Sequence, residues 1–286
     1  MLIKVFQKGF NFSQDGPGNR LVYHLQGCNM NCPWCSNPEG IEKDGSIMVT
    51  EGVDDAVCPN GAISSGMLDS KLCRGCPKMC LQTLHMGIKL SCDTYHTDEI
   101  VSEAARSKSM FFSGGGVTFT GGEPTLNLPA LIDMLKKLKQ EDINTAIETN
   151  GSHPDLASAT EYIDHLIIDF KHYDDDRHRK TVGISNAIIK KNLKRLSLIR
   201  KINIRIPLIK GFNAEEENAV GFVNTLSECN KQNITVEFLS FHEFGKSKWQ
   251  QCGMEYKMKG YEYISDDTSE MFTRIFKDNG FDIIRT

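Results

Sequence analysis

The chain has 286 residues, of which 40% are hydrophobic and 24% are charged, and its net charge is −4. This length predicts one large domain, or one domain with a small extra module, whose core needs no disulfide staples. The first twenty residues lack a secretory apolar core, no apolar run reaches the ~18 residues of a membrane span, and no basic tract indicates nucleic-acid binding. We therefore expect a globular, cytoplasmic protein.

Apolar segments that predict strands alternate with amphipathic segments that predict helices. The run Leu166–Ile168 is continuously apolar, as in strands that are buried on both faces of a parallel sheet. Such alternation predicts βα units, and six units predict an incomplete (β/α)6 barrel, because eight units take ~250 residues. An open doubly wound sheet would give the same pattern. The expected strands are 21–25, 116–120, 143–148, 166–170, 202–208 and 234–241, and the expected helices are 97–110, 128–138, 154–163, 186–199, 214–229 and 267–278.

The segment 48–92 interrupts this alternation. It contains five of the ten cysteines and no long helical pattern. We interpret it as an inserted module, with residues 1–47 and 93–286 forming the barrel.

Cys28, Cys32 and Cys35 form a C-x3-C-x2-C loop directly after the first expected strand. In a reducing compartment such clusters bind metal or perform redox chemistry more often than they form disulfides. Three thiolates can hold a [4Fe–4S] cluster that normally takes four, which leaves one iron open for a substrate or cofactor. A zinc site, the alternative, normally takes four ligands with C-x2-C or Cys/His spacing, which this loop fits poorly.

Further motifs lie on both sides of this loop. Asp15-Gly-Pro-Gly-Asn-Arg20 precedes it, and the motifs that follow are, in chain order, Ser113-Gly-Gly-Gly-Val-Thr118, Gly121-Gly-Glu-Pro124, Asp169-Phe-Lys171, Thr181-Val-Gly183, Ile204-Arg-Ile-Pro207 and His242-Glu-Phe-Gly245. The loop itself resembles the signature of radical S-adenosylmethionine (AdoMet) enzymes, and the set as a whole resembles the activating enzymes of glycyl-radical enzymes.

The resemblance implies that the open iron chelates AdoMet, whose reductive cleavage gives a 5′-deoxyadenosyl radical. It implies AdoMet contacts from Trp34, Cys35, Ser36, Gly122, Asp169, Phe170, Lys171 and His242, with a monovalent cation near the Asp169–Lys171 strand end in some relatives. It further implies that Asp15 and Arg205 lie near the partner's glycyl loop. Each feature also has an ordinary structural interpretation: a tight glycine turn, a strand-end salt bridge, a structural histidine or a turn-stabilising aspartate. Many relatives carry histidine at the position of Ser36, so the contribution of that histidine is missing here.

A second set of cysteines lies in the insert. Cys58-Pro59 resembles the last cysteine of a ferredoxin motif, and Cys73, Cys76 and Cys80 match the last three ligands of another, whose first position is Ser70. Four thiolates predict a single auxiliary [4Fe–4S] cluster in a ferredoxin-like insert. A four-cysteine zinc site is the alternative, and Cys92 could replace one ligand. Cys229 and Cys252 show no ligand spacing, and we expect them to be packing residues.

These features predict an activase that removes a hydrogen atom from the Cα of a glycine in a partner glycyl-radical enzyme. The resemblance implies flavodoxin or ferredoxin as the reductant, and we expect a monomer. One alternative is a radical AdoMet enzyme that acts on a small molecule or on another protein side chain. The other is a non-catalytic iron–sulfur electron carrier or zinc protein.

Overall fold

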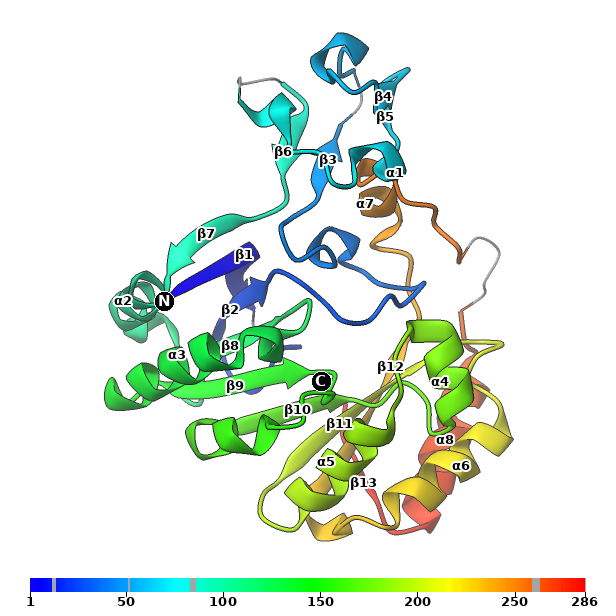
Figure 1. The fold of residues 1–286 in the computed structure, drawn as a ribbon. Helices are drawn as coiled ribbons and strands as arrows, with labels where there is room; N and C mark the ends of the chain where they lie inside the picture. The colour runs from blue at the N-terminus through cyan, green and yellow to red at the C-terminus, as the bar shows by residue number, and fades with distance from the viewer. Residues whose placement is uncertain (12–13, 51, 83–85, 259–262, 286) are drawn as a thin grey trace.

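The computed structural model describes residues 1–11, 14–50, 52–82, 86–258 and 263–285. Its centre is a nine-stranded sheet in the order β13-β12-β11-β10-β9-β8-β2-β1-β7 (Figure 1). The strands are β1 (Leu2–Asn11), β2 (Arg20–Leu25), β7 (Asp93–His96), β8 (Gly116–Gly121), β9 (Asn144–Thr149), β10 (His165–Asp169), β11 (Ile202–Leu208), β12 (Ile234–Ser240) and β13 (Asp282–Ile283).

All six predicted strands are present, and they pair in parallel in chain order from β2 to β12. A doubly wound sheet would reverse its strand order at a switch point, so this order excludes that alternative. Within the described ranges no ladder joins the edge strands β7 and β13, and the barrel is therefore incomplete, as predicted. Within this sheet, the strands that the sequence pattern did not indicate are β1, β7 and β13, and all three lie at its two ends.

Helices connect the parallel strands and cover the sheet. They are α2 (Thr97–Arg106), α3 (Leu128–Gln140), α4 (Asp175–Val182), α5 (Ala187–Ser197), α6 (Glu216–Leu226), α7 (Lys246–Gln251) and α8 (Asp266–Asp278), with 3₁₀ turns η4 (Lys108–Met110), η5 (Pro124–Asn127), η6 (Leu156–Tyr162) and η7 (Lys231–Asn233). The prediction of a helix over 154–163 is met by the 3₁₀ turn η6. The short helices α4 and α7 were not predicted. No helix among the described residues has the length and apolarity to cross a bilayer.

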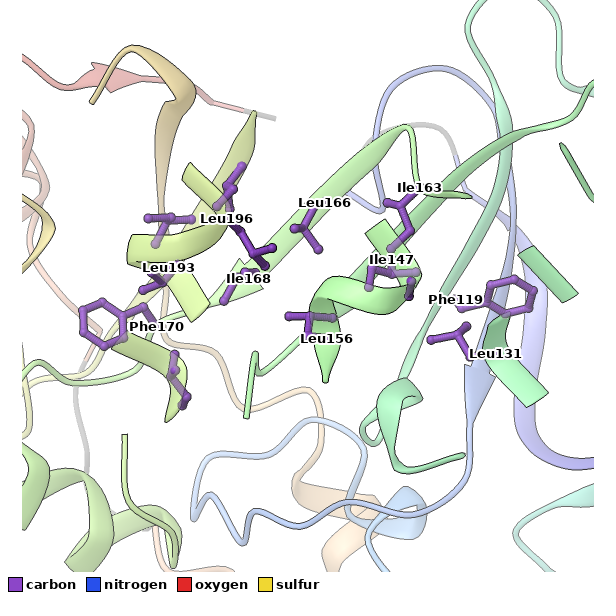
Figure 2. Packing of buried hydrophobic residues seen from close by; sticks show 14 of the residues in the cluster. Phe119, Leu131, Ile147, Leu156, Ile163, Leu166, Ile168, Phe170, Leu193 and Leu196 are labelled. Carbon is purple, nitrogen blue, oxygen red and sulfur yellow. The ribbon is translucent and has the colours of Figure 1, made fainter. Parts of the chain in front are cut away.

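The core lies between the sheet and these helices. Leu131, Leu135 and Leu138 of α3 have no exposed surface, which confirms the predicted leucine stripe. Each buried leucine contributes roughly 1.5–3 kcal/mol relative to an exposed one. Figure 2 shows Leu131 facing Phe119 of β8, and the same core continues to Phe170 after β10.

The cysteine-rich segment folds around a small hydrophobic cluster of its own. Strand β3 (Ile47–Val49) pairs with β6 (Ile88–Leu90), and β4 (Ile63–Ser64) pairs with β5 (Met67–Leu68). Short turns complete it: η2 (Asp55–Val57), α1 (Ser70–Cys73) and η3 (Met79–Leu81). Its buried residues are Ile47, Val49, Val53, Ala62, Ile63 and Leu68, and Cys58, Cys73 and Cys80 pack against them. In Figure 1 this segment projects from the barrel above β1 and β2.

Candidate functional site

The C-x3-C-x2-C loop begins at the carboxyl end of β2, where parallel barrels place their active sites. The backbone N–H groups of Gly27 and Cys28 donate to the carbonyls of Gly40 and Ile41, so both ends of the loop are tied together. Within it, the N–H of Met30 donates to Cys28 Sγ and that of Asn37 to Cys35 Sγ, each at 3.4 Å. Amide N–H groups that point at sulfur favour thiolate, the form that binds iron.

The three thiols share one electrostatic environment, in which Cys32 is buried and Cys28 and Cys35 are half-buried. Burial raises the pKa of Cys32 to about 12, while the nearby Lys171 ammonium acts in the opposite direction. Burial also raises the pKa values of Cys28 and Cys35, and the thiols of Cys32 and Cys35 raise the pKa of Cys28 further. Thiols in such a place become thiolates when a metal binds them. In the part of the chain that the structure describes, no three metal-ligating side chains converge on a single ion. A cubane does not require that, because each thiolate binds a different iron, and this set of donors fits a [4Fe–4S] cluster.

The predicted Gly-Gly-Glu-Pro turn lies beside the start of this loop. The N–H groups of Gly122 and Glu123 donate to the carbonyls of Leu25 and Gly27, at 2.9 and 2.7 Å. A Cβ atom at Gly122 would lie 2.0 Å from the Gly27 carbonyl oxygen, so only glycine permits this approach. The close backbone contact explains the glycine pair more specifically than an ordinary turn does.

Glu123 fixes the turn from inside the protein, a role that the sequence analysis did not assign. Its carboxylate is 2% exposed and accepts hydrogen bonds from Thr125 N (3.0 Å), Thr125 Oγ1 (2.5 Å), Thr149 Oγ1 (2.6 Å) and Asn150 N (2.7 Å). Burial raises the pKa of Glu123, and these donors partly offset the effect. The turn after β8 is thereby fastened to the end of β9.

Asp169 and Lys171 form the strand-end pair that the sequence predicts. Lys171 Nζ lies 2.8 Å from Asp169 Oδ2, and both interact electrostatically with Cys32. Burial alone would lower the pKa of Lys171, but Asp169 and the thiols raise it overall. The side chain of Phe170 belongs to the hydrophobic core, as Figure 2 shows, and its ring lies 5.4 Å from that of Phe222. Phe170 can therefore meet a ligand at this edge only through its backbone.

Aromatic side chains form one wall of the site. The Trp34 ring lies 4.9 Å from that of Phe212, in a cluster with Phe241. His242, the next residue, follows β12 and stacks on Phe244 at 4.3 Å, and burial lowers its pKa. The residue directly before His242 therefore belongs to the cluster against which Trp34 packs, and the ring of His242 itself contacts that of Phe244. Ser36 lies beside Gly245, whose Cβ would be 2.7 Å from the Ser36 Cα.

Asp15 and Arg205 are linked through the segment that enters the barrel. Arg205 donates through Nε to Glu237 and through Nη1 to Glu148, each at 2.7 Å, and through Nη2 to the carbonyl of Gln14. Its side chain is only 4% exposed. The two glutamates were not predicted as functional residues. The sequence marks them only weakly, because each is a lone acidic residue in an apolar strand.

Four of the five cysteines of the insert line one hollow. Cys58, Cys73, Cys76 and Cys80 line it together with Asn60, whose Nδ2 donates to Cys76 Sγ at 3.0 Å. The N–H of Ala62 donates to Cys58 Sγ at 3.3 Å, and burial raises the pKa values of Cys73 and Cys80. Cys92 is not among the lining residues; its sulfur packs against Gly45. All ten cysteines are free thiols.

Known proteins resemble this chain over most of its length. A profile described as the Radical SAM superfamily matches residues 22–223. A 4-hydroxyphenylacetate decarboxylase activating enzyme of Clostridioides difficile (strain CD196) is 33% identical, over 93% of this chain and 90% of its own. A choline trimethylamine-lyase activating enzyme of Oleidesulfovibrio alaskensis is 31% identical, over 88% of this chain and 87% of its own.

Solved structures agree with these relatives. A domain of a pyruvate-formate lyase-activating enzyme from Bacteroides vulgatus is 27% identical, with a TM-score of 0.50 over 60% of this chain and 98% of its own. A radical SAM methyltransferase from Sphaerobacter thermophilus, 15% identical, shares the fold with a TM-score of 0.58 over 96% of this chain and 67% of its own. The chain therefore belongs to the radical SAM superfamily and, within it, to the activating enzymes of glycyl-radical enzymes.

Proposed function

We propose that Cys28, Cys32 and Cys35 hold the [4Fe–4S] cluster with which this activating enzyme works, and that AdoMet binds between it and the strand ends. The observation that carries this assignment is the meeting of three thiols (one buried, two half-buried), the Gly122 turn and the Asp169–Lys171 pair at one edge of the sheet. When bound, cluster and AdoMet supply a 5′-deoxyadenosyl radical, which takes a hydrogen atom from a glycine Cα of the partner enzyme.

The protein's own groups orient these cofactors and balance their charge. The turn at Gly122 offers backbone polar groups to the amino group of AdoMet. Lys171 offsets the negative charge of the thiolates, and Asp169 holds Lys171 in place and could ligate a monovalent cation. Trp34 and His242 enclose the adenosyl group, while Ser36, Cys35 and the backbone of Phe170 complete the wall. Hydrogen transfer needs no general acid or base.

Asp15 and Arg205 serve the partner's glycyl loop in this proposal. Because Arg205 is occupied by Glu148, Glu237 and the Gln14 carbonyl, it acts through the Gln14–Asp15 segment rather than by direct contact. Arg205 is thus a positioning residue, and Asp15 is the candidate contact.

The insert, residues 48–92, is proposed as a ferredoxin-like module with an auxiliary [4Fe–4S] cluster on Cys58, Cys73, Cys76 and Cys80. The hollow that these cysteines line and the N–H···S bonds to two of them support it. The cluster would relay an electron inward or brace the docking surface. We further propose flavodoxin or ferredoxin as the reductant, a monomeric state and a cytoplasmic location, in which free thiols persist.

The test is anaerobic reconstitution with iron and sulfide, followed by dithionite and AdoMet, with 5′-deoxyadenosine as the readout. Cys32→Ala should abolish the product, whereas Cys229→Ala, a cysteine outside both sets, should not. Iron analysis should give about eight atoms per chain, and about four in a Cys73→Ala/Cys76→Ala variant. If the wild type contains about four iron atoms and one zinc ion per chain, the insert holds a zinc site and not an auxiliary cluster. A fully loaded wild type that forms no product would overturn the assignment of the three-cysteine site.

The partner is tested separately. Mixing the loaded protein with glycyl-radical enzymes should give a glycyl-radical signal in electron paramagnetic resonance (EPR) with its own partner. Product formation without such a signal for any of them would favour a small-molecule substrate.

A further inference from the structure

Helix α7 is hydrogen-bonded to the loop that carries the third cysteine of the radical site. Trp249 Nε1 donates to the Cys35 carbonyl at 2.8 Å. Lys248 Nζ donates to Asn37 Oδ1 at 2.8 Å and lies 2.6 Å from Glu39 Oε1. The Trp249 side chain and Glu39 are each 5% exposed, so water does not readily replace these contacts. Helix α7 therefore holds residues 35–39 through three side-chain interactions, although the two segments are more than 200 positions apart in the sequence.

The start of α7 reinforces this contact through the backbone. A Cβ atom at Gly245 would lie 2.7 Å from the Cys35 carbonyl oxygen. The two segments thus meet backbone to backbone, at a distance that a side chain would prevent. Helix α7 also contacts the 3₁₀ turn η1 (Pro38–Gly40), which follows the cysteine loop.

The other side of the same segment contacts the insert. Helix α7 packs against β3 and β5, and Figure 1 shows it beside β3 and α1. Gly253, just after α7, has a φ of +63°, and a Cβ there would lie 2.3 Å from the Leu68 carbonyl oxygen. The N–H of Ser70 donates to the Gly253 carbonyl at 3.4 Å. Ser70 begins α1, the helix that ends at Cys73.

We propose that residues 245–253 couple the two cysteine sites mechanically. Trp249 and Lys248 are positioning residues that keep Cys35 and the following turn closed over the radical-site cluster, and Gly253 seats this segment on the insert. A disturbance of the insert then reaches Cys35 without any contact between the two sets of thiols. The inference rests on the proposed cluster at Cys28, Cys32 and Cys35, but not on the identity of the partner.

The expected effect follows from local opening of the loop. Oxygen or a chelator attacks the cluster in those molecules in which the cysteine loop is transiently open. The fraction of such molecules grows when contacts that hold the loop closed are lost. Loss of one neutral hydrogen bond should raise that population ~5-fold. Lys248→Met should have a larger effect, because it leaves the buried Glu39 carboxylate without its cation. Glu39 Oε2 already has no hydrogen-bond partner among the described residues.

The experiment measures how fast the radical-site cluster is lost in the reconstituted full-length protein. The observed signal is the part of the reduced EPR spectrum that changes on adding AdoMet; Cys32→Ala, which lacks it, identifies it. Its decay in the presence of an iron chelator is compared among wild type, Trp249→Phe, Lys248→Met and Gly253→Ala. Lys248→Arg should restore most of the protection that Lys248→Met removes.

Two control variants match these changes. Lys246→Met removes an exposed lysine of the same helix, paired with Glu243 at 3.4 Å. Gly280→Ala places a side chain at a φ of +79° where no atom lies within 4 Å of the new Cβ. In both control variants the signal should decay at the wild-type rate.

The coupling is supported if Trp249→Phe, Lys248→Met and Gly253→Ala all lose the signal several-fold faster than the controls. Wild-type decay in Trp249→Phe and Lys248→Met would overturn their positioning role. If the signal decays in Gly253→Ala at the same rate as in Gly280→Ala, the proposed link between residues 245–253 and the insert is overturned. An AdoMet-dependent signal absent even from the wild type would instead refute the proposed cluster site.

Discussion

Replacement of Arg205 by methionine tests how much the charged layer inside the barrel contributes to stability. The Arg205 guanidinium lies between Glu148 and Glu237 at 2.7 Å from each, and also binds the Gln14 carbonyl. Methionine keeps most of the chain length but removes the charge and every donor. Both carboxylates then lose their ion pair with Arg205.

The structure sets the magnitude of this effect. Breaking a buried ion pair from one side costs about 3–5 kcal/mol, because the remaining charge stays desolvated. The Glu237 side chain is 3% exposed and that of Glu148 is 20% exposed, so solvent can relieve only Glu148 in part. We therefore expect the free energy of unfolding to fall by about 3 kcal/mol near neutral pH.

The loss should depend on pH with a defined sign. Burial raises the pKa of Glu148 above its usual 4.5, and Arg205 opposes this rise. Without Arg205 the folded-state pKa rises further, so the folded protein binds protons that the unfolded chain releases. Stability is then retained at low pH and lost as the pH rises from about 4.5 through the folded-state pKa. The deficit of Arg205→Met should be smaller at pH 5.5 than at pH 8.

Urea unfolding of the cluster-free chain, followed by circular dichroism in anaerobic reducing buffer, provides the measurement. Arg179→Met is the matched control, since that side chain is 61% exposed and pairs with Asp175 on the surface of α4. It should change the free energy of unfolding by no more than about 0.5 kcal/mol. A loss below about 1 kcal/mol in Arg205→Met, or a larger loss at pH 5.5 than at pH 8, would refute the reasoning.

Three other changes give distinct expectations. Glu123→Gln places an amide N–H₂ where a buried carboxylate accepts four hydrogen bonds, and should cost about 2 kcal/mol in urea unfolding; unchanged stability would show that the turn is held otherwise. His172 accepts from Asp174 N at 2.9 Å, and burial lowers its pKa to about 4. As the pH falls, the unfolded chain protonates His172 at a higher pH than the folded protein does. The free energy of unfolding of the wild type should therefore decrease between pH 6.5 and pH 4, and that of His172→Gln should decrease less; the same decrease in both proteins would contradict this. Lys171→Met should weaken AdoMet binding to the loaded protein about tenfold by calorimetric titration, while the exposed Lys180→Met leaves it unchanged; equal affinities would remove Lys171 from the site.

The sequence by itself determined the features that depend on local spacing. The stripe Leu131, Leu135 and Leu138 has helical periodicity and is fully buried, and the run Leu166–Ile168 forms a central parallel strand. The spacing of Cys28, Cys32 and Cys35 identified the family, because ligands of one cluster must be reached from a single short loop. The order of the glycine, D-x-K and histidine motifs followed the order of the strands whose ends they occupy.

Only the tertiary structure decided which distant residues meet. Arg205 of β11 lies opposite Glu237 of the neighbouring strand β12 and reaches Glu148 of β9 across β10. No local pattern marks a lone glutamate in an apolar strand. Residues 156–162 form a 3₁₀ turn although their sequence also suits an α-helix. Trp249 reaches Cys35, and Gly253 reaches Leu68, through contacts between segments far apart in the chain. Such contacts depend on packing and burial across the whole fold, whereas sequence spacing reports only on groups that one helix, strand or loop holds together.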